Sequence, residues 1–290
     1  MARDVRKGFY FGKNVFLTGG SSGIGLALAR LLAQRGANLW LVARDPAKLA
    51  AAAEEIKKVR VDPAQRVEFS TADVSEEAQA KKAVEKATAA FGLPDIVINN
   101  AGVTHPGYFQ ELDGEVFHRM MDVNYYGTLN ITRAVVPGMI RRGGGQIINV
   151  SSGVAFMAVF GYSAYAASKW AVRGLTDVLR AELKQHNIRF TLAMPPDTDT
   201  PQLAGEEHLR PFELTVIAGS NKVYPPEKVA RDILDGAERN RYIILTGADT
   251  IFYYWLSQLL GPLQYPVMDM VVADAVRKKR KKQKEAANRV

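Results

Sequence analysis

Short runs rich in Val, Ile and Leu alternate with longer Ala-rich stretches of helical periodicity from Lys13 to about Phe190. This alternation is typical of repeated βαβ units, so we predict an α/β fold with a doubly wound parallel sheet of the Rossmann type. Beyond residue 205 this alternation is less regular. The pattern then predicts a helix over 226–239 and a strand over 241–246. The strands expected before that point cover residues 14–19, 39–43, 66–70, 95–100, 145–151 and 188–194.

Residues 250–268 carry no charge and form a stretch long enough in principle to span a bilayer. Gly and Pro residues interrupt it, and its Trp and Tyr content favours an interface over a hydrocarbon centre. We therefore predict a catalytic domain over 1–249, an apolar membrane-interfacial extension over 250–276 and a disordered basic tail over 277–290. Two alternatives stay open for 250–268: a cover over the substrate cleft or an oligomer contact, and a true span.

The net charge of +8 would suggest a polyanionic partner, but residues 277–290 hold +7 of it, which leaves +1 for the first 276 residues. A body this close to neutral argues against nucleic-acid binding and leaves an anionic membrane surface as the partner of the tail. The chain has no cysteine, which excludes disulfides and thiolate catalysis, and its four histidines show no His-x-x-x-His spacing, so we expect no metal. The N-terminus shows no signal-peptide pattern, so we expect a cytoplasmic body, peripheral on the cytosolic face of a membrane.

The first predicted strand runs directly into "TGGSSGIG" at residues 18–25. Glycines here allow a sharp turn, bring backbone N–H groups close to an anion and let the following helix pack tightly. The spacing is G-x-x-x-G-x-G rather than G-x-G-x-x-G, but its position after a strand predicts dinucleotide binding. The residues expected at the cofactor are Gly19, Ser21, Ser22, Gly23, Ile24 and Gly25.

The end of the second strand indicates which nucleotide is bound. Ala43 stands where an NAD site usually has an acid, and Arg44 follows it. Asp45 before Pro46 fits a helix N-cap better than a ribose ligand. We therefore predict NADPH (NADP+), with Arg44, Lys48, Ser21 and Ser22 around the 2′-phosphate. Asp73 and Val74 either border the adenine or form an ordinary loop.

The stretch "GYSAYAASKWAV" at residues 161–172 contains two tyrosines and one lysine. Tyrosine exchanges protons poorly near neutral pH unless a nearby cation stabilises its phenolate. Tyr165 and Lys169 are four residues apart and adjoin on a helix, whereas Tyr162 lies about two turns from the lysine. Tyr165 is thus the catalytic candidate, and Tyr162 lines the approach or packs. Ser152, at the end of a strand, is expected near the tip of the sheet.

The motifs "TGGSSGIG", "NNAG" (99–102), "VNYYG" (123–127), "INVSS" (148–152) and "YAASK" (165–169) follow one another in the order of the short-chain dehydrogenase/reductase family. The chain resembles that family over roughly 14–201. The resemblance implies that Ser152 orients a carbonyl, Tyr165 delivers its proton, Lys169 holds the nicotinamide ribose and lowers the tyrosine pKa, and Asn124 supports a proton relay. It also implies a homodimer or homotetramer. Near the cofactor it places Asn100, Ala101, Gly102, Pro195 and Thr198.

The segment "MPPDTDTPQL" at residues 194–203 departs from the family's usual Pro-Gly, since Pro196 replaces the glycine. Together with "GGSSG" and "LVAR", this segment resembles the 3-ketodihydrosphingosine reductases, which implies NADPH-dependent reduction of the 3-keto group of a long-chain sphingoid base. Asp197 or Asp199 would then pair with the substrate ammonium, next to Ser152 and Tyr162, or else serve only as loop and cap residues. The alternatives are a 3-oxoacyl-thioester reductase, a hydroxysteroid-type dehydrogenase and an NADP(H)-sensing binding protein on the same fold.

Overall fold

The computed structural model describes residues 8–219 and 221–287 of the chain. Within this part, seven parallel strands form one sheet in the order β3-β2-β1-β4-β5-β6-β7. The predicted doubly wound parallel sheet is confirmed. The strands are β1 (Asn14–Thr18), β2 (Asn38–Ala43), β3 (Val67–Thr71), β4 (Ile96–Asn99), β5 (Gly145–Val150), β6 (Ile188–Met194) and β7 (Ile243–Leu245).

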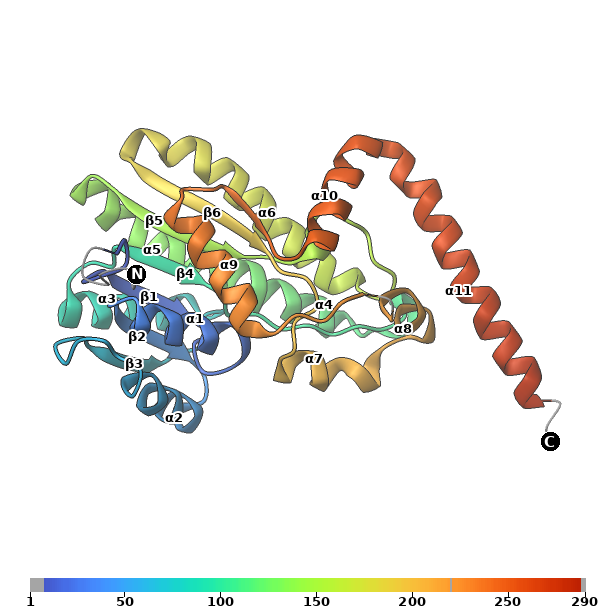
Figure 1. Cartoon of the computed structure of the whole chain (residues 1–290), viewed down its shortest axis with the longest axis horizontal. Coiled ribbons are helices and arrows are strands. Elements are labelled where there is room, and N and C mark those ends of the chain that lie inside the picture. The colour runs from blue at the N-terminus through green and yellow to red at the C-terminus, as the bar shows by residue number, and fades with distance from the viewer. Residues whose placement is uncertain (1–7, 220, 288–290) are drawn as a thin grey trace, which may run out of the picture.

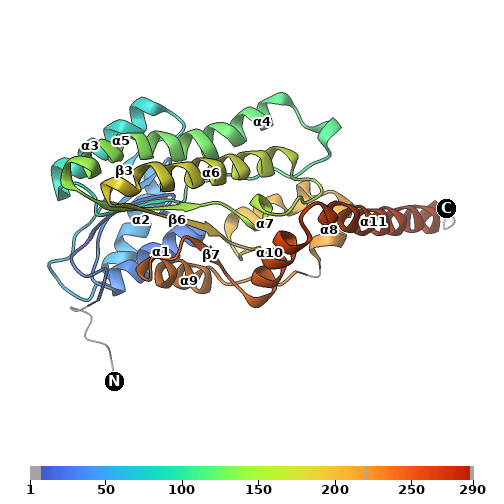
Figure 2. The same ribbon diagram turned by 90° about the horizontal axis from the view of Figure 1, so that it is seen from above.

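Helices cover both faces of the sheet, as Figure 2 shows with the sheet seen between two layers. Strand side chains alternate between these layers, so that Leu17 belongs to the core under α1, α2 and α9 and Phe16 to the core under α3 and α5. The helices are α1 (Gly23–Gln34), α2 (Pro46–Lys57), α3 (Glu77–Phe91), α4 (Gly114–Met120), α5 (Gly127–Arg142), α6 (Ser163–Glu182), α7 (Pro201–Glu206), α8 (Phe212–Ala218), α9 (Pro226–Glu238), α10 (Ala248–Leu260) and α11 (Gln264–Ala287).

The strand order reverses direction at β1, which pairs with β2 on one side and with β4 on the other. Loops from neighbouring strands diverge at such a switch point, and ligands of open α/β sheets bind in the crevice that they leave beyond the carboxyl ends of the strands. The fold therefore places the loops after β1, β4 and β5 around one crevice.

The C-terminal extension forms two helices at one end of the molecule, near α8 (Figure 1). A turn at Gly261–Leu263 separates α10 from α11, and α11 extends away from the sheet. Among the described helices, none combines the length and the apolar character that crossing a bilayer requires.

Residues 277–287 are helical, where the sequence predicts a disordered tail; residues 288–290 lie outside the described part. The run contains no Gly or Pro and is rich in Lys, Arg, Gln, Glu and Ala, which are good helix formers. Pairs of opposite charge four residues apart join Asp274 to Lys278 and Lys281 to Glu285. The local preference for helix outweighs the repulsion within the basic run.

Helix α11 is tied to the body by one buried carboxylate. Glu213 in α8 is only 4% exposed and accepts hydrogen bonds from Lys279 of α11 (3.1 Å) and from the Tyr108 hydroxyl (2.6 Å). Burial raises the pKa of Glu213, but the hydrogen bonds from Tyr108, from backbone N–H and from Lys279, together with the charge of Lys279, lower it overall. A lysine of the predicted tail thus fixes α11 against α8.

Candidate active site

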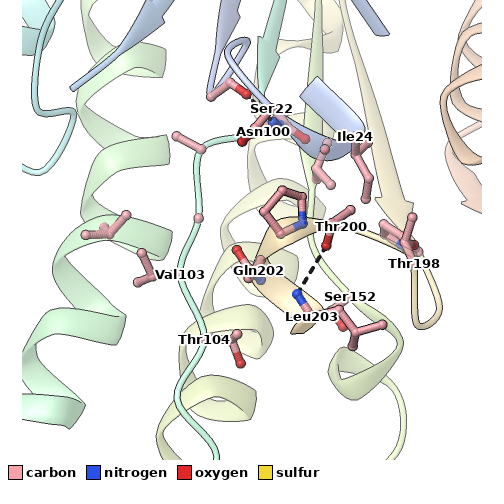
Figure 3. A pocket seen from close by; sticks show the side chains of 18 of the residues that line it. Ser22, Ile24, Asn100, Val103, Thr104, Ser152, Thr198, Thr200, Gln202 and Leu203 are labelled. Carbon is pink, nitrogen blue, oxygen red and sulfur yellow. Dashed lines mark hydrogen bonds between the residues drawn. The ribbon is translucent and has the colours of Figure 1, made fainter. Parts of the chain in front are cut away.

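A cavity of about 370 Å³ lies beyond the carboxyl ends of the strands (Figure 3). Three residues of the predicted site do not line this cavity: Gly25 and Asn124 lie behind its wall, and Asp199 is exposed on the surface. The predicted residues that the structure brings together around it are Gly19, Ser21, Ser22, Gly23, Ile24, Arg44, Lys48, Asp73, Val74, Asn100, Ala101, Gly102, Ser152, Tyr162, Tyr165, Lys169, Pro195, Asp197 and Thr198.

The glycine turn after β1 has a shape that other residues would not allow. Gly19 and Gly23 have φ angles of +69° and +52°, which disfavour any side chain. A Cβ added at Gly25 would lie 2.0 Å from the carbonyl oxygen of Gly19, so the start of α1 can approach the turn only without a side chain. The helix N-terminus and the free backbone N–H groups of the turn suit a phosphate, and the cradle therefore fits a dinucleotide.

The loop after β4 braces this turn. The Asn100 side chain donates to the carbonyl oxygens of Thr18 and Gly19, both at 3.2 Å. The Thr18 hydroxyl in turn accepts from the backbone N–H groups of Asn100 and Ala101, both at 3.1 Å. Asn99, one residue earlier, joins β4 to β5 through the Asn149 side chain. These hydrogen bonds hold the cavity wall in place.

Two cations, Arg44 and Lys48, line the cavity at the start of α2. Arg44 is 56% exposed and lies 3.8 Å from Asp73, and Lys48 is more exposed still. Asp45 accepts the backbone N–H groups of Ala47 and Lys48 and so caps α2, as predicted. Lys48 lies 3.8 Å from the Asp45 carboxylate, and both cations line the cavity with more than half of each side chain exposed.

Ser152, Tyr165 and Lys169, three of the predicted catalytic residues, line the other end of the cavity. Tyr165 is in the first turn of α6, and the Lys169 Nζ lies 5.8 Å from its ring centre. Burial lowers the pKa of Lys169 to about 8, and its ammonium donates to the Val150 carbonyl at 3.1 Å. Burial raises the pKa of Tyr165 above its usual 10, whereas a hydrogen bond with Ser152 lowers it. Burial therefore keeps the phenol protonated, as a proton donor requires, and the predicted lowering of the tyrosine pKa by Lys169 is not seen in this structure.

Asn124 supports the cavity wall from a π-helical segment, Met121–Tyr126, of the kind often found at functional sites. Its side chain accepts from Val103 N (2.8 Å) and donates to Val103 O (3.0 Å) and to Ser168 Oγ (2.9 Å). It is 1% exposed. Asn124 thus holds the loop after β4 against α6, the helix that carries Tyr165 and Lys169.

The loop after β6 closes the cavity. The Thr200 hydroxyl caps α7 by accepting Leu203 N at 3.3 Å, and Thr200, Gln202 and Leu203 face the cavity beside Ile24 (Figure 3). These three residues were not predicted from the sequence, although Thr200 before Pro201 is a typical start of a helix and marks the position of α7.

A buried carboxylate in this wall, that of Glu206, was not predicted from the sequence. Glu206 is 5% exposed and lines the cavity from the end of α7. It accepts the Tyr162 hydroxyl at 2.7 Å and Arg210 at 2.6 Å. The pair of Glu206 with Arg210, four residues on, has a spacing that the sequence shows, but the burial of Glu206 and its contact with Tyr162, the residue before α6, depend on tertiary packing.

A second cavity, of about 380 Å³, shares Ser152, Tyr162 and Asp197 with the first. Apolar side chains of the loop after β5, of α8 and of the C-terminal extension form most of its wall. They include Met157, Val159, Leu214, Ile217, Tyr253, Leu256, Leu260, Val267, Met268 and Val271. The extension therefore covers an apolar compartment that begins at the predicted catalytic serine, which is the cover alternative left open by the sequence.

Comparison with known proteins agrees with this geometry. A family model for short chain dehydrogenases matches residues 13–209. The 3-ketodihydrosphingosine reductase of Bos taurus is 38% identical over 249 residues, which cover 86% of this chain and 74% of the relative. That of Dictyostelium discoideum is 35% identical over 280 residues, which cover 92% and 84%. A short-chain dehydrogenase/reductase of Burkholderia phymatum, solved with NAD, is 26% identical, has a TM-score of 0.77 and matches 88% of this chain and 96% of its own.

The chain belongs to the short-chain dehydrogenase/reductase family and is an oxidoreductase. Within that family it is similar, over most of its length, to several curated 3-ketodihydrosphingosine reductases.

Proposed function

We propose that this protein is an NADPH-dependent reductase of the 3-keto group of a long-chain sphingoid base, 3-ketodihydrosphingosine, and that it acts in sphingolipid biosynthesis. The observation that carries the proposal is the apolar compartment that joins the predicted catalytic serine to the C-terminal extension. A long alkyl chain fits such a wall, and its carbonyl end then lies between Ser152 and Tyr165. The family's relatives with this printed activity support the same substrate.

In this proposal each residue has a separate role in one reduction. The nicotinamide, when bound, supplies a hydride to the carbonyl carbon. Ser152 donates a hydrogen bond that orients the carbonyl oxygen, and Tyr165 transfers its phenolic proton to that oxygen. Lys169 stabilises the resulting phenolate by its charge and holds the nicotinamide ribose. Asn124 supports the proton relay that returns a proton to Tyr165.

The substrate is tested by comparing kcat/KM for 3-ketodihydrosphingosine, 3-oxoacyl thioesters and steroid ketones. We expect the sphingoid base to be preferred and kcat/KM to rise with alkyl length until the compartment is filled, because each buried methylene contributes about 0.8 kcal/mol. A preference for 3-oxoacyl thioesters or steroids would leave only the general reductase assignment. No turnover of any ketone, with NADPH still bound, would favour the NADP(H)-sensing alternative.

The choice of NADPH over NADH depends on Arg44. We expect Arg44→Ala to lower the preference for NADPH about tenfold, since a charge-assisted hydrogen bond to the 2′-phosphate is lost and NADH has no such phosphate. Titration of both cofactors measures this. Arg30→Ala serves as the matched control because Arg30 pairs with Glu55 outside the cavity. Equal affinity of the wild type for the two cofactors would contradict the assignment.

A membrane surface is the proposed source of the substrate. The extension exposes large apolar side chains, including Phe252, Trp255 and Leu259, which are 61%, 65% and 85% exposed. The basic run of α11 follows them, as expected of a segment that binds anionic lipid. The protein would then be cytoplasmic and peripheral on the cytosolic face. Its assembly as a dimer or tetramer stays a prediction that rests on the family resemblance alone.

Vesicle sedimentation tests the membrane proposal. We expect Trp255→Gln with Leu259→Gln to reduce binding to anionic vesicles about tenfold or more, because burial of each side chain contributes about 1.5–3 kcal/mol. Trp170→Gln is the matched control, since Trp170 is 46% exposed on α6. Added salt should also weaken binding. Equal binding by wild type and the double variant would remove the proposal.

A further inference from the structure

A buried acidic group lies where the two cavities meet. Asp197 and Tyr162 line both cavities, and Glu206 lines the first beside them. Glu206 is 5% exposed and Tyr162 is 7% exposed, so both are largely withdrawn from bulk water. A carboxylate in such a place needs compensating positive charge or hydrogen bonds.

The hydrogen bonds around the Glu206 carboxylate involve only one of its two oxygens. The hydroxyl of Tyr162 and the guanidinium of Arg210 both donate to Oε1, at 2.7 and 2.6 Å. The second carboxylate oxygen, Oε2, has no hydrogen bond from any residue in the described part of the chain. The carboxylate of Asp197 also lines the cavity, and the Arg210 guanidinium that donates to Glu206 lowers the pKa of Asp197 as well, so one guanidinium serves both carboxylates.

The negative charge of these carboxylates affects Tyr165, at the catalytic end of the site. The rings of Tyr162 and Tyr165 are 5.6 Å apart between centres. Besides burial, the charges of Glu206 and Asp197 raise the pKa of Tyr165. Burial likewise raises the pKa of Asp197, and Glu206 adds to it against the opposing effect of Arg210. A ligand with a positive charge next to the reacting carbonyl would offset the negative charge of Glu206 and Asp197 beside Tyr165.

We infer that Glu206, held by Tyr162 and Arg210 and assisted by Asp197, receives the ammonium group of the substrate. This inference rests on the proposed function, because a sphingoid 3-ketone carries its amine on the carbon next to the carbonyl. With the carbonyl between Ser152 and Tyr165, that amine lies within reach of the wall formed by Asp197 and Glu206. Asp199, one of the two aspartates suggested by the sequence, is exposed and lines neither cavity.

The test compares two long-chain 3-ketones of equal length, one with and one without the 2-amino group. For wild type we expect the amino ketone to have the higher kcat/KM. For Glu206→Gln we expect the ratio of the two kcat/KM values to fall about ten- to a hundredfold, which is the usual effect of losing one charge-assisted hydrogen bond. Glu206→Asp, which keeps the charge, should recover part of the ratio. The control Glu207→Gln changes an exposed neighbour and should leave the ratio unchanged.

Two failures are distinguishable. If wild type reduces the ketone without the amine at least as well as the amino ketone, the proposed substrate is wrong. If wild type prefers the amino ketone and Glu206→Gln keeps that preference, the substrate stands and the role of Glu206 is wrong. Should Glu206→Gln fail to bind NADPH, inhibition of wild type decides instead: long-chain alkylammonium ions must inhibit more strongly than alcohols of equal length, and equal inhibition would overturn the inference.

Discussion

Replacing Tyr165 by phenylalanine is expected to lower kcat/KM for the ketone by about 10²- to 10⁴-fold, the range typical of losing a general acid. The variant removes one oxygen and keeps the ring beside Ser152 and Lys169, so NADPH should bind with nearly the wild-type Kd. Steady-state kinetics together with a fluorescence titration of NADPH measure the two effects separately.

Tyr162→Phe is the matched control, since Tyr162 lies three residues before Tyr165 and lines the same cavity. The Tyr162 hydroxyl donates a hydrogen bond to Glu206. Burial raises the pKa of Tyr162 most, and the negative charge of Glu206 raises it further. We expect a loss of about two- to tenfold, as for a single hydrogen bond. If Tyr162→Phe were the more damaging change, the assignment of the proton donor would be reversed.

The second large effect is expected at the glycine turn. Gly25→Ala places a Cβ where the Gly19 carbonyl oxygen lies 2.0 Å away, and that oxygen also accepts from Asn100. The turn must shift, which should raise the Kd of NADPH about ten- to a hundredfold through the loss of a hydrogen bond to a phosphate. The overpacking should also lower the free energy of unfolding by about 1–3 kcal/mol.

Gly174→Ala separates this steric effect from a general intolerance of alanine at glycine. Gly174 lies inside α6, is exposed and has open space around its Cα. Here alanine should raise the free energy of unfolding by about 0.5–1 kcal/mol, because it favours the helix, and NADPH binding should not change. Chemical denaturation and the same titration measure both. Unchanged NADPH affinity in Gly25→Ala would contradict the proposed phosphate cradle.

Features with a local cause could be predicted from the sequence. Most strands are apolar runs bounded by turn residues, and the predicted strands agree with the structure to within a residue or two at their ends. Pairing of Tyr165 with Lys169 follows from helix geometry alone, and Asp45 caps α2 because its side chain reaches N–H groups two and three residues ahead. Charge alone predicts disorder for residues 277–287, but they form part of α11. Their good helix formers and spaced ion pairs outweigh the repulsion between like charges.

The fold class, the glycine turn and the grouping of Ser152, Tyr165 and Lys169 could be predicted from the sequence, because each depends mainly on neighbours within a few residues along the chain. Which carboxylates line the cavity could not be predicted, because that depends on the tertiary structure. Glu206 gains its burial and its partners from Tyr162 and Arg210, whereas Asp199 is turned to solvent although it stands two residues from Asp197. The apolar compartment likewise exists only because α10 and α11 fold back onto α8 and the loop after β5. Contacts between segments so distant in sequence leave no periodic pattern along the chain, and they arise only when the chain packs.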